Sequence, residues 1–226
     1  MKVESALPSS RQRILDHGEV FTPPGLVNDM LDLVANECER EDSRFLEPAC
    51  GDGNFLTEVL RRRLAHVSRK HRAQRQWEAH ALLGLACLYG IELLPDNAER
   101  CRDRMVAVFR GAYEARFESS AKAAVVRAAR HIVARNVLQG DALSMTGPTG
   151  APLVLTEWAL VGRGMLKRRL FEYRELAPEP RRPAPNLFEE EPSLFDEDGK
   201  PVFLARHLRH LPPVHYLDLA EEEEAP

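Results

Sequence analysis

The chain has 226 residues, of which 44% are hydrophobic, so it is long enough to bury one sizeable core. Its formal net charge is -4, and the composition lacks the overall basic balance that indicates nucleic-acid binding. No segment approaches the roughly 18 consecutive apolar residues of a membrane span, and the first residues lack the apolar core of a signal peptide. The four cysteines are far apart without a CxxC pair, which argues against a zinc site or a disulfide framework and favours reduced thiols in a cytoplasm.

Residues 1–16 are polar and are expected to form a mobile arm or a short helix. Residues 17–40 have the features of a helix. Thr22 can cap it, and Pro23 and Pro24 fit its first turn, where a missing N–H costs nothing. Apolar residues then recur at helical spacing, which predicts one apolar face formed by Leu26, Val27, Met30, Leu31, Leu33 and Val34.

Residues 44–56 read RFLEPACGDGNFL and predict a strand, a sharp turn and a helix. The apolar run fits a short buried strand, two glycines with Asp52 between them make the turn, and Asn54 begins an amphipathic helix. This geometry brings a ligand against backbone N–H groups at a helix N-terminus. Because Asp52 repels anions, the turn favours a ligand with positive charge, such as an ammonium or a sulfonium. The alternative is a tight turn that binds nothing.

Residues 61–75 carry seven Arg or Lys and no acid. Such a run usually forms a solvated face, and the alternative is a surface that contacts phosphate or a partner. Residues 77–89 are apolar enough for a buried helix that leads into a strand at residues 88–93. Glu92 lies at the carboxyl end of that strand, where a carboxylate can accept hydrogen bonds from two ribose hydroxyls. A chance acid at a strand end is the alternative.

Two further helices and a third strand follow. Pro95 and Asp96 start one helix, and residues 119–134 predict the other. Residues 136–141 then form a short strand that ends in a Gly-Asp turn. Three strands alternating with helices indicate an α/β doubly wound sheet, and a ligand is expected across the carboxyl ends of its strands.

Four short segments of the chain occur in the order of a known series of motifs. They are GEVFTPP at residues 18–24, EPACGDGNFL at residues 47–56, Ile91-Glu92, and GDAL at residues 140–143. In that order they resemble motifs X, I, II and III of the N6-adenine DNA methyltransferases, which use S-adenosylmethionine. The resemblance covers about residues 17–145, and it implies the Rossmann-like sheet of a class I methyltransferase, present here only as its cofactor half.

The resemblance also implies which residues contact the cofactor. Phe21 and Thr22 would line its methionine end, where Asp52 and Glu47 would favour the positive charge. Glu92 would bind the ribose, and Asp141 would accept a hydrogen bond from the exocyclic amine of the adenine. The complete set of implied contacts is Phe21, Thr22, Glu47, Ala49, Gly51, Asp52, Gly53, Glu92, Asp141 and Ala142.

The family's catalytic motif IV, an Asn, Asp or Ser followed by Pro-Pro and an aromatic, is not found after Asp141. The strand expected at residues 153–158 has no Pro-Pro after it, and the prolines at 212–213 lack the polar and aromatic neighbours. That motif holds the amine of an adenine flipped out of the duplex, so no catalytic residue can be named. We therefore expect a split restriction–modification enzyme, in which a partner polypeptide supplies motif IV, target recognition and the contact with DNA. The alternative is an inactive or scaffold module of a defence complex.

The expected organisation has four parts. Residues 1–16 form the arm, and residues 17–146 form the partial cofactor domain. Residues 147–183 are a basic and aromatic extension, either an amphipathic helix on its neighbour or a segment that contacts nucleic acid. Residues 184–226 carry many acids and few apolar residues, which predicts partial disorder and a strap that docks on a partner. No metal site is expected among the histidines of this tail.

Overall fold

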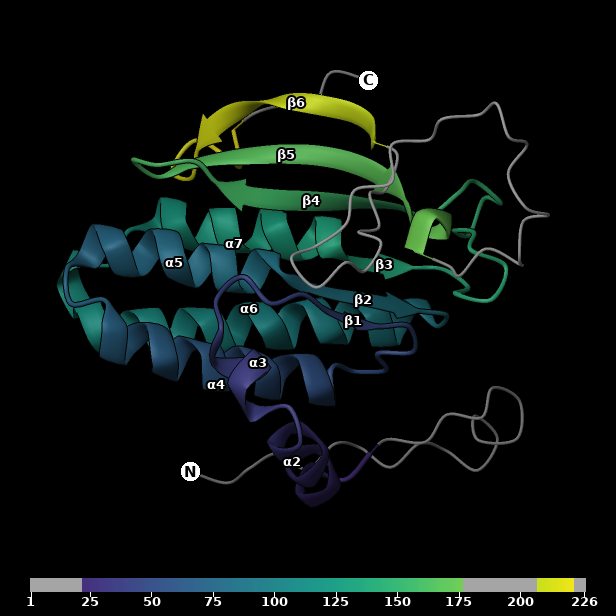
Figure 1. Cartoon of the computed structure of the whole chain (residues 1–226), viewed down its shortest axis with the longest axis horizontal. Helices are drawn as coiled ribbons and strands as arrows, with labels where there is room; N and C mark the ends of the chain where they lie inside the picture. Colours follow the sequence, from purple (N-terminus) through teal and green to yellow (C-terminus); the bar gives the residue numbers. More distant parts are fainter. Residues whose placement is uncertain (1–21, 177–206, 222–226) are drawn as a thin grey trace, which may run out of the picture.

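The computed structural model describes residues 22–176 and 207–221, and it arranges them in layers (Figure 1). The helices are α2 (Pro24–Asp32), α3 (Ala35–Glu39), α4 (Asn54–Lys70), α5 (Gln74–Ala86), α6 (Pro95–Phe117) and α7 (Ala123–Asn136). The strands are β1 (Phe45–Glu47), β2 (Leu88–Glu92), β3 (Val137–Gln139), β4 (Val154–Leu160), β5 (Met165–Glu172) and β6 (His207–His215). Two 3-10 turns, η1 (Glu118–Ser120) and η2 (Tyr173–Leu176), complete the described elements.

The three short strands β1, β2 and β3 form a parallel sheet in the order β1-β2-β3. Every residue of β2 is buried, as expected of a central parallel strand covered on both faces. Helices α4 and α6 pack against the strands, and Tyr89 of β2 packs instead against Leu155 and Phe171 of a second sheet. The predicted α/β class is therefore confirmed, although the chain covers part of its parallel sheet with strands rather than helices.

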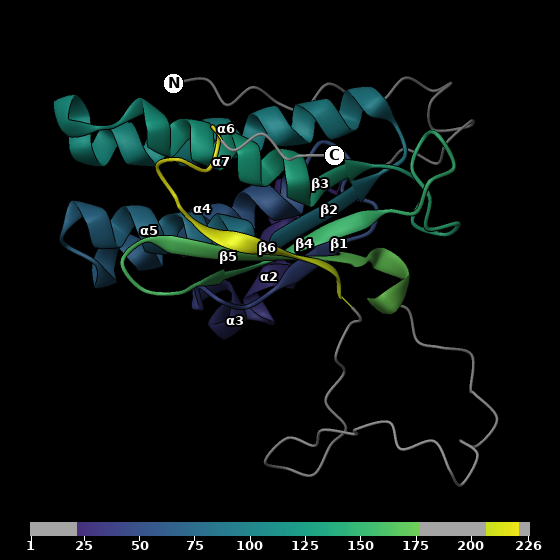
Figure 2. The ribbon, with the colours of Figure 1, turned by 90° about the horizontal axis from the view of Figure 1, so that it is seen from above.

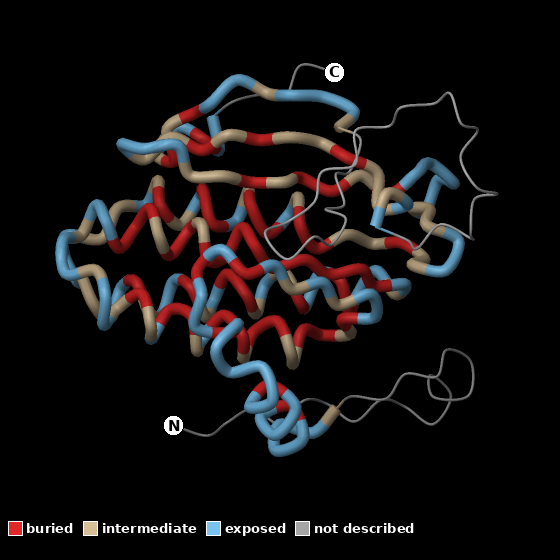
Figure 3. The backbone as a smooth tube through the Cα atoms, viewed as in Figure 1, coloured by how far each residue is buried: buried red, intermediate tan, exposed pale blue. Residues whose placement is uncertain are grey.

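Helices α5 and α7 lead almost directly into β2 and β3, as the sequence predicts for residues 77–93 and 119–141. Their inner sides meet α4 and α6 around Trp77, whose ring stacks on Tyr113 at a centroid distance of 5.5 Å. Figure 3 shows buried residues gathered where these helices face one another and along the parallel strands. None of the described helices has the length and apolar composition needed to cross a membrane.

The start of the described chain differs from the predicted single helix. Pro23, not Thr22, is the N-cap residue of α2, and no side chain caps the helix. The chain then breaks between α2 and α3, and only Val27 and Leu31 of α2 are buried, against α4. The remaining predicted apolar positions of this segment are exposed: Leu26, Met30, Leu33 and Val34.

The described part of the basic and aromatic extension contains a β-hairpin. Its first strand, β4, confirms the strand predicted at residues 153–158, whereas the amphipathic helix expected in the basic segment that follows is wrong, because β5 lies there. The alternative, a contact with nucleic acid, stays a prediction. Strands β4 and β5 pair in antiparallel fashion, with Leu155 opposite Phe171 and Leu160 opposite Leu166. Seen from above, this second sheet lies over α5 and extends toward the parallel strands (Figure 2). The basic residues of β5 are thus placed at alternating sides of a strand rather than along one helical stripe.

The predicted disorder of the tail is wrong for residues 207–221. Strand β6 pairs with β5 and completes the order β4-β5-β6, and Val214, Tyr216 and Leu219 are buried. The prolines at 212–213 lie in this edge strand, where a missing N–H is tolerated, so they do not form a catalytic loop. The predictions for residues 1–16 and for the remainder of the tail lie outside the described residues.

Three of the seven basic residues at positions 61–75 pair with acids that precede β1, namely Arg62, Arg69 and Lys70. Arg62 pairs with Asp32 at 2.7 Å, and Arg69 pairs with Glu39 at 2.8 Å. Arg63 is fully buried, and donates from Nη1 to the Gly84 carbonyl at 2.7 Å and from Nη2 to the Ser43 carbonyl at 2.8 Å. These contacts hold the N-terminal segment against α4 and α5, so much of the run is engaged within the fold, while Arg72 and Arg75 are exposed.

Candidate functional site

The carboxyl ends of the three parallel strands meet at one edge of the molecule, on the right of Figure 1. The last residues of the strands are Glu47, Glu92 and Gln139, and Glu92 lies opposite Gln139 in the register. The loops that follow are fastened to β2: the Cys50 N–H donates to the Ile91 carbonyl at 3.0 Å, and the Gly140 N–H donates to the Glu92 carbonyl at 2.9 Å. Three segments that the sequence singles out separately therefore lie side by side.

The turn between β1 and α4 requires glycine. Gly51 and Gly53 have φ angles of 53° and 88°, in the left-handed region that glycine adopts without strain. A Cβ atom on Gly53 would lie 2.7 Å from Cys101 Sγ on α6, closer than the two atoms can approach. The predicted strand, turn and helix are thus confirmed, and the turn is packed directly on α6.

Glu92 connects the glycine turn to the end of β2. Its carboxylate accepts a hydrogen bond from the Gly51 N–H at 2.8 Å and another from the Leu94 N–H at 3.0 Å, one on each oxygen. The residue is only 7% exposed. Since each carboxylate oxygen can accept a further hydrogen bond, Glu92 retains acceptor capacity toward a ligand hydroxyl.

Asp52 is paired within the protein. Its Oδ2 lies 2.6 Å from Arg104 Nη1 of α6, and the same guanidinium reaches the Asp52 carbonyl at 2.7 Å and Asn54 Oδ1 at 2.9 Å. The other carboxylate oxygen, Oδ1, is buried with no hydrogen-bond partner in the described chain. Arg104 therefore offsets the negative charge that the sequence alone would assign to the turn. No local sequence signal reveals it, because it comes from a helix 52 residues away.

Glu47 is a carboxylate of this edge without an ion-pair partner in the part of the chain that the structure describes. It ends β1 and is half-buried, and burial raises the pKa of its carboxyl because the charged form loses hydration. Within the described residues Glu47 makes no hydrogen bond or ion pair. Ala49, another predicted contact two residues on, is exposed. A half-buried carboxylate of this kind would be stabilised by a cationic ligand.

The third strand ends in a compact turn. The Asp141 carboxylate accepts a hydrogen bond from the Leu143 N–H at 2.8 Å, and that bond and the Ser144 hydroxyl lower the pKa of the carboxyl. Ala142, the next residue after Asp141, is half-buried, and Leu143 is 92% exposed. Leu93, directly after Glu92, is 54% exposed. Large apolar side chains exposed beside strand-end acids could contact a planar ring.

The upstream segment reaches the same edge through one contact. Asn54, the first residue of α4, donates from Nδ2 to the Thr22 carbonyl at 3.1 Å. Thr22 therefore lies beside the glycine turn, as its assignment to the methionine end of the ligand requires. Phe21, assigned to the same end, lies outside the described residues.

A second cluster of polar side chains escaped the sequence analysis. Glu41, His71 and His80 bring their ligating atoms within 4.8 Å of one another. They are 30 and 9 residues apart, a spacing that matches no familiar metal motif, so only the tertiary structure reveals them.

Comparisons of the chain with protein-family models, with curated proteins and with solved structures find no match.

Proposed function

We propose that this chain is the S-adenosylmethionine-binding part of a DNA adenine-N6 methyltransferase whose catalytic motif lies on another polypeptide. The hydrogen bond between the Gly51 N–H and Glu92 carries the proposal, because it joins the glycine turn to the acid of the second strand. Two independent sequence signals thereby become parts of one site.

Each group at the edge has a matching part of this cofactor. Glu92 has free acceptor positions for the ribose hydroxyls, and the unpartnered carboxylate of Glu47 suits the positive methionyl end. The Asp141 carboxylate already accepts hydrogen bonds from Leu143 and Ser144, and its remaining lone pair would serve the exocyclic amine of the adenine, beside the exposed Leu143. Bound there, the cofactor would supply an electrophilic methyl group, and the protein would contribute by orienting it and excluding water.

Two observations support a partner polypeptide: the chain lacks the catalytic motif after Asp141, and it exposes apolar residues near β1 and α2. No Asn, Asp or Ser before Pro-Pro and an aromatic occurs after Asp141, so the acceptor amine has no holder here. Among the described residues β1 pairs only with β2, which leaves its outer edge available to another strand. Leu46 of that strand is 37% exposed, and Leu33 beside α2 is 86% exposed. A partner covering these residues would bury apolar surface and complete the enzyme, in our proposal a restriction–modification system.

One observation favours a second candidate, a binding or scaffold module without transfer activity in a defence complex. The Arg104 guanidinium lies against Asp52, and its positive charge opposes a cationic ligand at the turn. Adding a partner that carries the missing motif separates the two candidates, because only the split enzyme would then methylate adenine in DNA.

The direct test of the site is cofactor affinity in Glu47→Gln, measured by equilibrium dialysis with labelled S-adenosylmethionine. The variant keeps the shape of the side chain but removes the charge, and within the described residues Glu47 makes no hydrogen bond or ion pair that the change would break. We expect affinity to fall about tenfold, the value of one charge contact of about 1.4 kcal/mol. Glu99→Gln, an exposed acid on α6, is the matched control and should bind as the wild type. Equal affinity in all three proteins would exclude Glu47 from the site.

A further inference from the structure

Glu41 forms the centre of a polar cluster at the corner between α4 and α5. It follows α3, is only 7% exposed, and lies between two histidines from other parts of the chain. His71, directly after α4, places Nε2 at 3.0 Å from Glu41 Oε1, and His80 of α5 contacts Oε2 through Nδ1. The imidazole rings are stacked, with centroids 3.8 Å apart and planes at 12°. Three neutral or anionic donors thus converge from three separate segments.

The donor types and their spacing fit a transition metal ion. Two histidines and a glutamate are a ligand set that zinc uses, with metal–nitrogen and metal–oxygen distances of about 2.0–2.2 Å. Tetrahedral geometry at those distances requires ligand atoms roughly 3.3 Å apart. The three ligating atoms here lie within 4.8 Å of one another, close to the separation that coordination requires.

One lysine occupies part of the same space. Lys70 Nζ lies 3.1 Å from Glu41 Oε1, and its side chain is 56% exposed, so it can swing into solvent.

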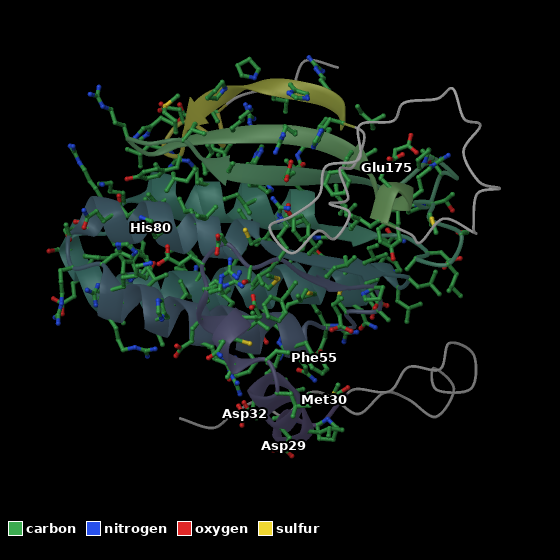
Figure 4. All side chains as sticks on the ribbon, in the orientation of Figure 1. Asp29, Met30, Asp32, Phe55, His80 and Glu175 are labelled. Atoms are coloured by element: carbon green, nitrogen blue, oxygen red, sulfur yellow. The ribbon has the colours of Figure 1, made fainter. Side chains whose placement is uncertain are left out.

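We propose that Glu41, His71 and His80 bind a divalent transition metal ion of the zinc class, with water or solvent at the fourth position. The ion would displace Lys70 and replace the hydrogen bonds of Glu41 with His71 and His80 by three coordinate bonds. It would fasten the segment before β1 to the corner of α4 and α5. Figure 4 shows His80 on the opposite side of the molecule from Glu175, which lies near the carboxyl ends of the parallel strands, so this site is separate from the candidate cofactor site.

The test uses the full chain, stripped with a chelator and titrated with Zn²⁺ by calorimetry, with Co²⁺ absorption spectra as an independent readout. We expect one equivalent to bind to the wild type and to raise its unfolding temperature. Affinity should fall more than about tenfold in His80→Ala and in Glu41→Gln, since loss of even an outer-shell partner costs that much. His66→Ala is the matched control, because His66 lies on α4 beside Glu39 and outside the cluster.

Lys70→Ala distinguishes a metal site from a network of ion pairs. Removing an exposed competitor for Glu41 should tighten Zn²⁺ binding, whereas a residue that only stabilises the fold cannot improve it. Circular dichroism identifies any variant that fails to fold. If His80→Ala or Glu41→Gln does not fold, Lys70→Ala still tests for a metal site, because its substitution is at an exposed position. No stoichiometric uptake by the wild type, or equal uptake by the wild type, His80→Ala and Glu41→Gln, would overturn the proposal.

Discussion

Glu78 shows how one buried acid can hold distant segments together. It is fully buried on α5, and its carboxylate accepts hydrogen bonds from Tyr113 of α6 and, at 2.6 Å, from Tyr216 near the C-terminus. Lys122, just before α7, pairs with it at 2.8 Å. A buried carboxylate is tolerated only when it is paired in this way, and removal of one member leaves the others unsatisfied.

The pH dependence of stability should reflect Glu78. Burial raises the pKa of its carboxyl, but the hydrogen bonds from Lys122 and the tyrosines outweigh burial and lower the pKa from 4.5. Because the unfolded chain takes up the proton first, this stabilisation is complete above the ordinary value and is lost as pH falls through the lowered one. Glu78→Gln should lower the free energy of unfolding at neutral pH by about 1–3 kcal/mol. It should also flatten the acid limb of the stability curve, measured by urea unfolding between neutral and acidic pH.

Glu114→Gln is the control for that experiment, because Glu114 is an exposed acid on α6. Its urea midpoint and acid limb should match the wild type. A Glu78→Gln protein with unchanged stability at neutral pH would show that the network contributes nothing to folding.

A second prediction at this scale concerns the glycine turn. Gly53→Ala should destabilise the protein by about 1–3 kcal/mol, since alanine is strained at this positive φ and its Cβ would clash with Cys101. Gly111→Ala on α6 is the matched control: no atom lies within 4 Å of a Cβ added there, and helix propensity predicts a gain of up to about 1 kcal/mol. Thermal unfolding of both variants tests the contrast, and equal effects would contradict this account of the turn.

At the scale of elements, local patterns predict the parallel sheet and its helices well. The strand, turn and helix around Gly53, the helix into β2 and the helix into β3 all occur where the residues indicate them. Each carries its own signal, such as helical periodicity or a glycine pair, so no distant partner is needed to specify it.

In the second sheet only β4 occurs where the sequence predicts a strand, at residues 153–158, and β5 and β6 were missed because they depend on pairing between distant residues. β6 contains two prolines and several histidines, a poor strand composition, and it becomes a strand through its register with β5. Arg168 in β5 is buried, with its guanidinium donating to the Pro212 carbonyl at 3.1 Å, so the apolar alternation expected of a strand is broken. Local patterns likewise cannot predict the contacts of Arg104 and Glu41, because their partners come from other elements.

The buried residues of β6 and of the segment after it should contribute strongly to the stability of the protein. A chain ending at residue 206 would lose the buried Val214, Tyr216 and Leu219 and would leave Glu78 without one donor. Each apolar side chain contributes about 1.5–3 kcal/mol on burial, so the loss is comparable to the whole stability of a small domain. We expect this truncation to be unfolded or strongly destabilised by circular dichroism. A chain ending at residue 221 should unfold at the wild-type temperature, and equal stability of both truncations would contradict the role of β6.

At the scale of the whole molecule, the two ends of the helical layer carry different chemistry. The carboxyl ends of β1, β2 and β3 gather the acids and exposed leucines assigned to the cofactor, and the corner of α4 and α5 gathers the proposed metal ligands. The second sheet packs on both α5 and β2, and thereby links the helical layer to the parallel strands. Leu46 of β1 and the outward-facing Leu26 and Met30 of α2 are exposed among the described residues, and our proposal places the partner polypeptide there.

The most direct test of the central claim is S-adenosylmethionine binding measured by calorimetry, first with this chain alone and then with a partner polypeptide that carries the Asn-Pro-Pro-aromatic motif. The account predicts one cofactor per chain, bound more tightly when the partner is present, together with methyl transfer to adenine in DNA. Absence of binding under both conditions would contradict the account.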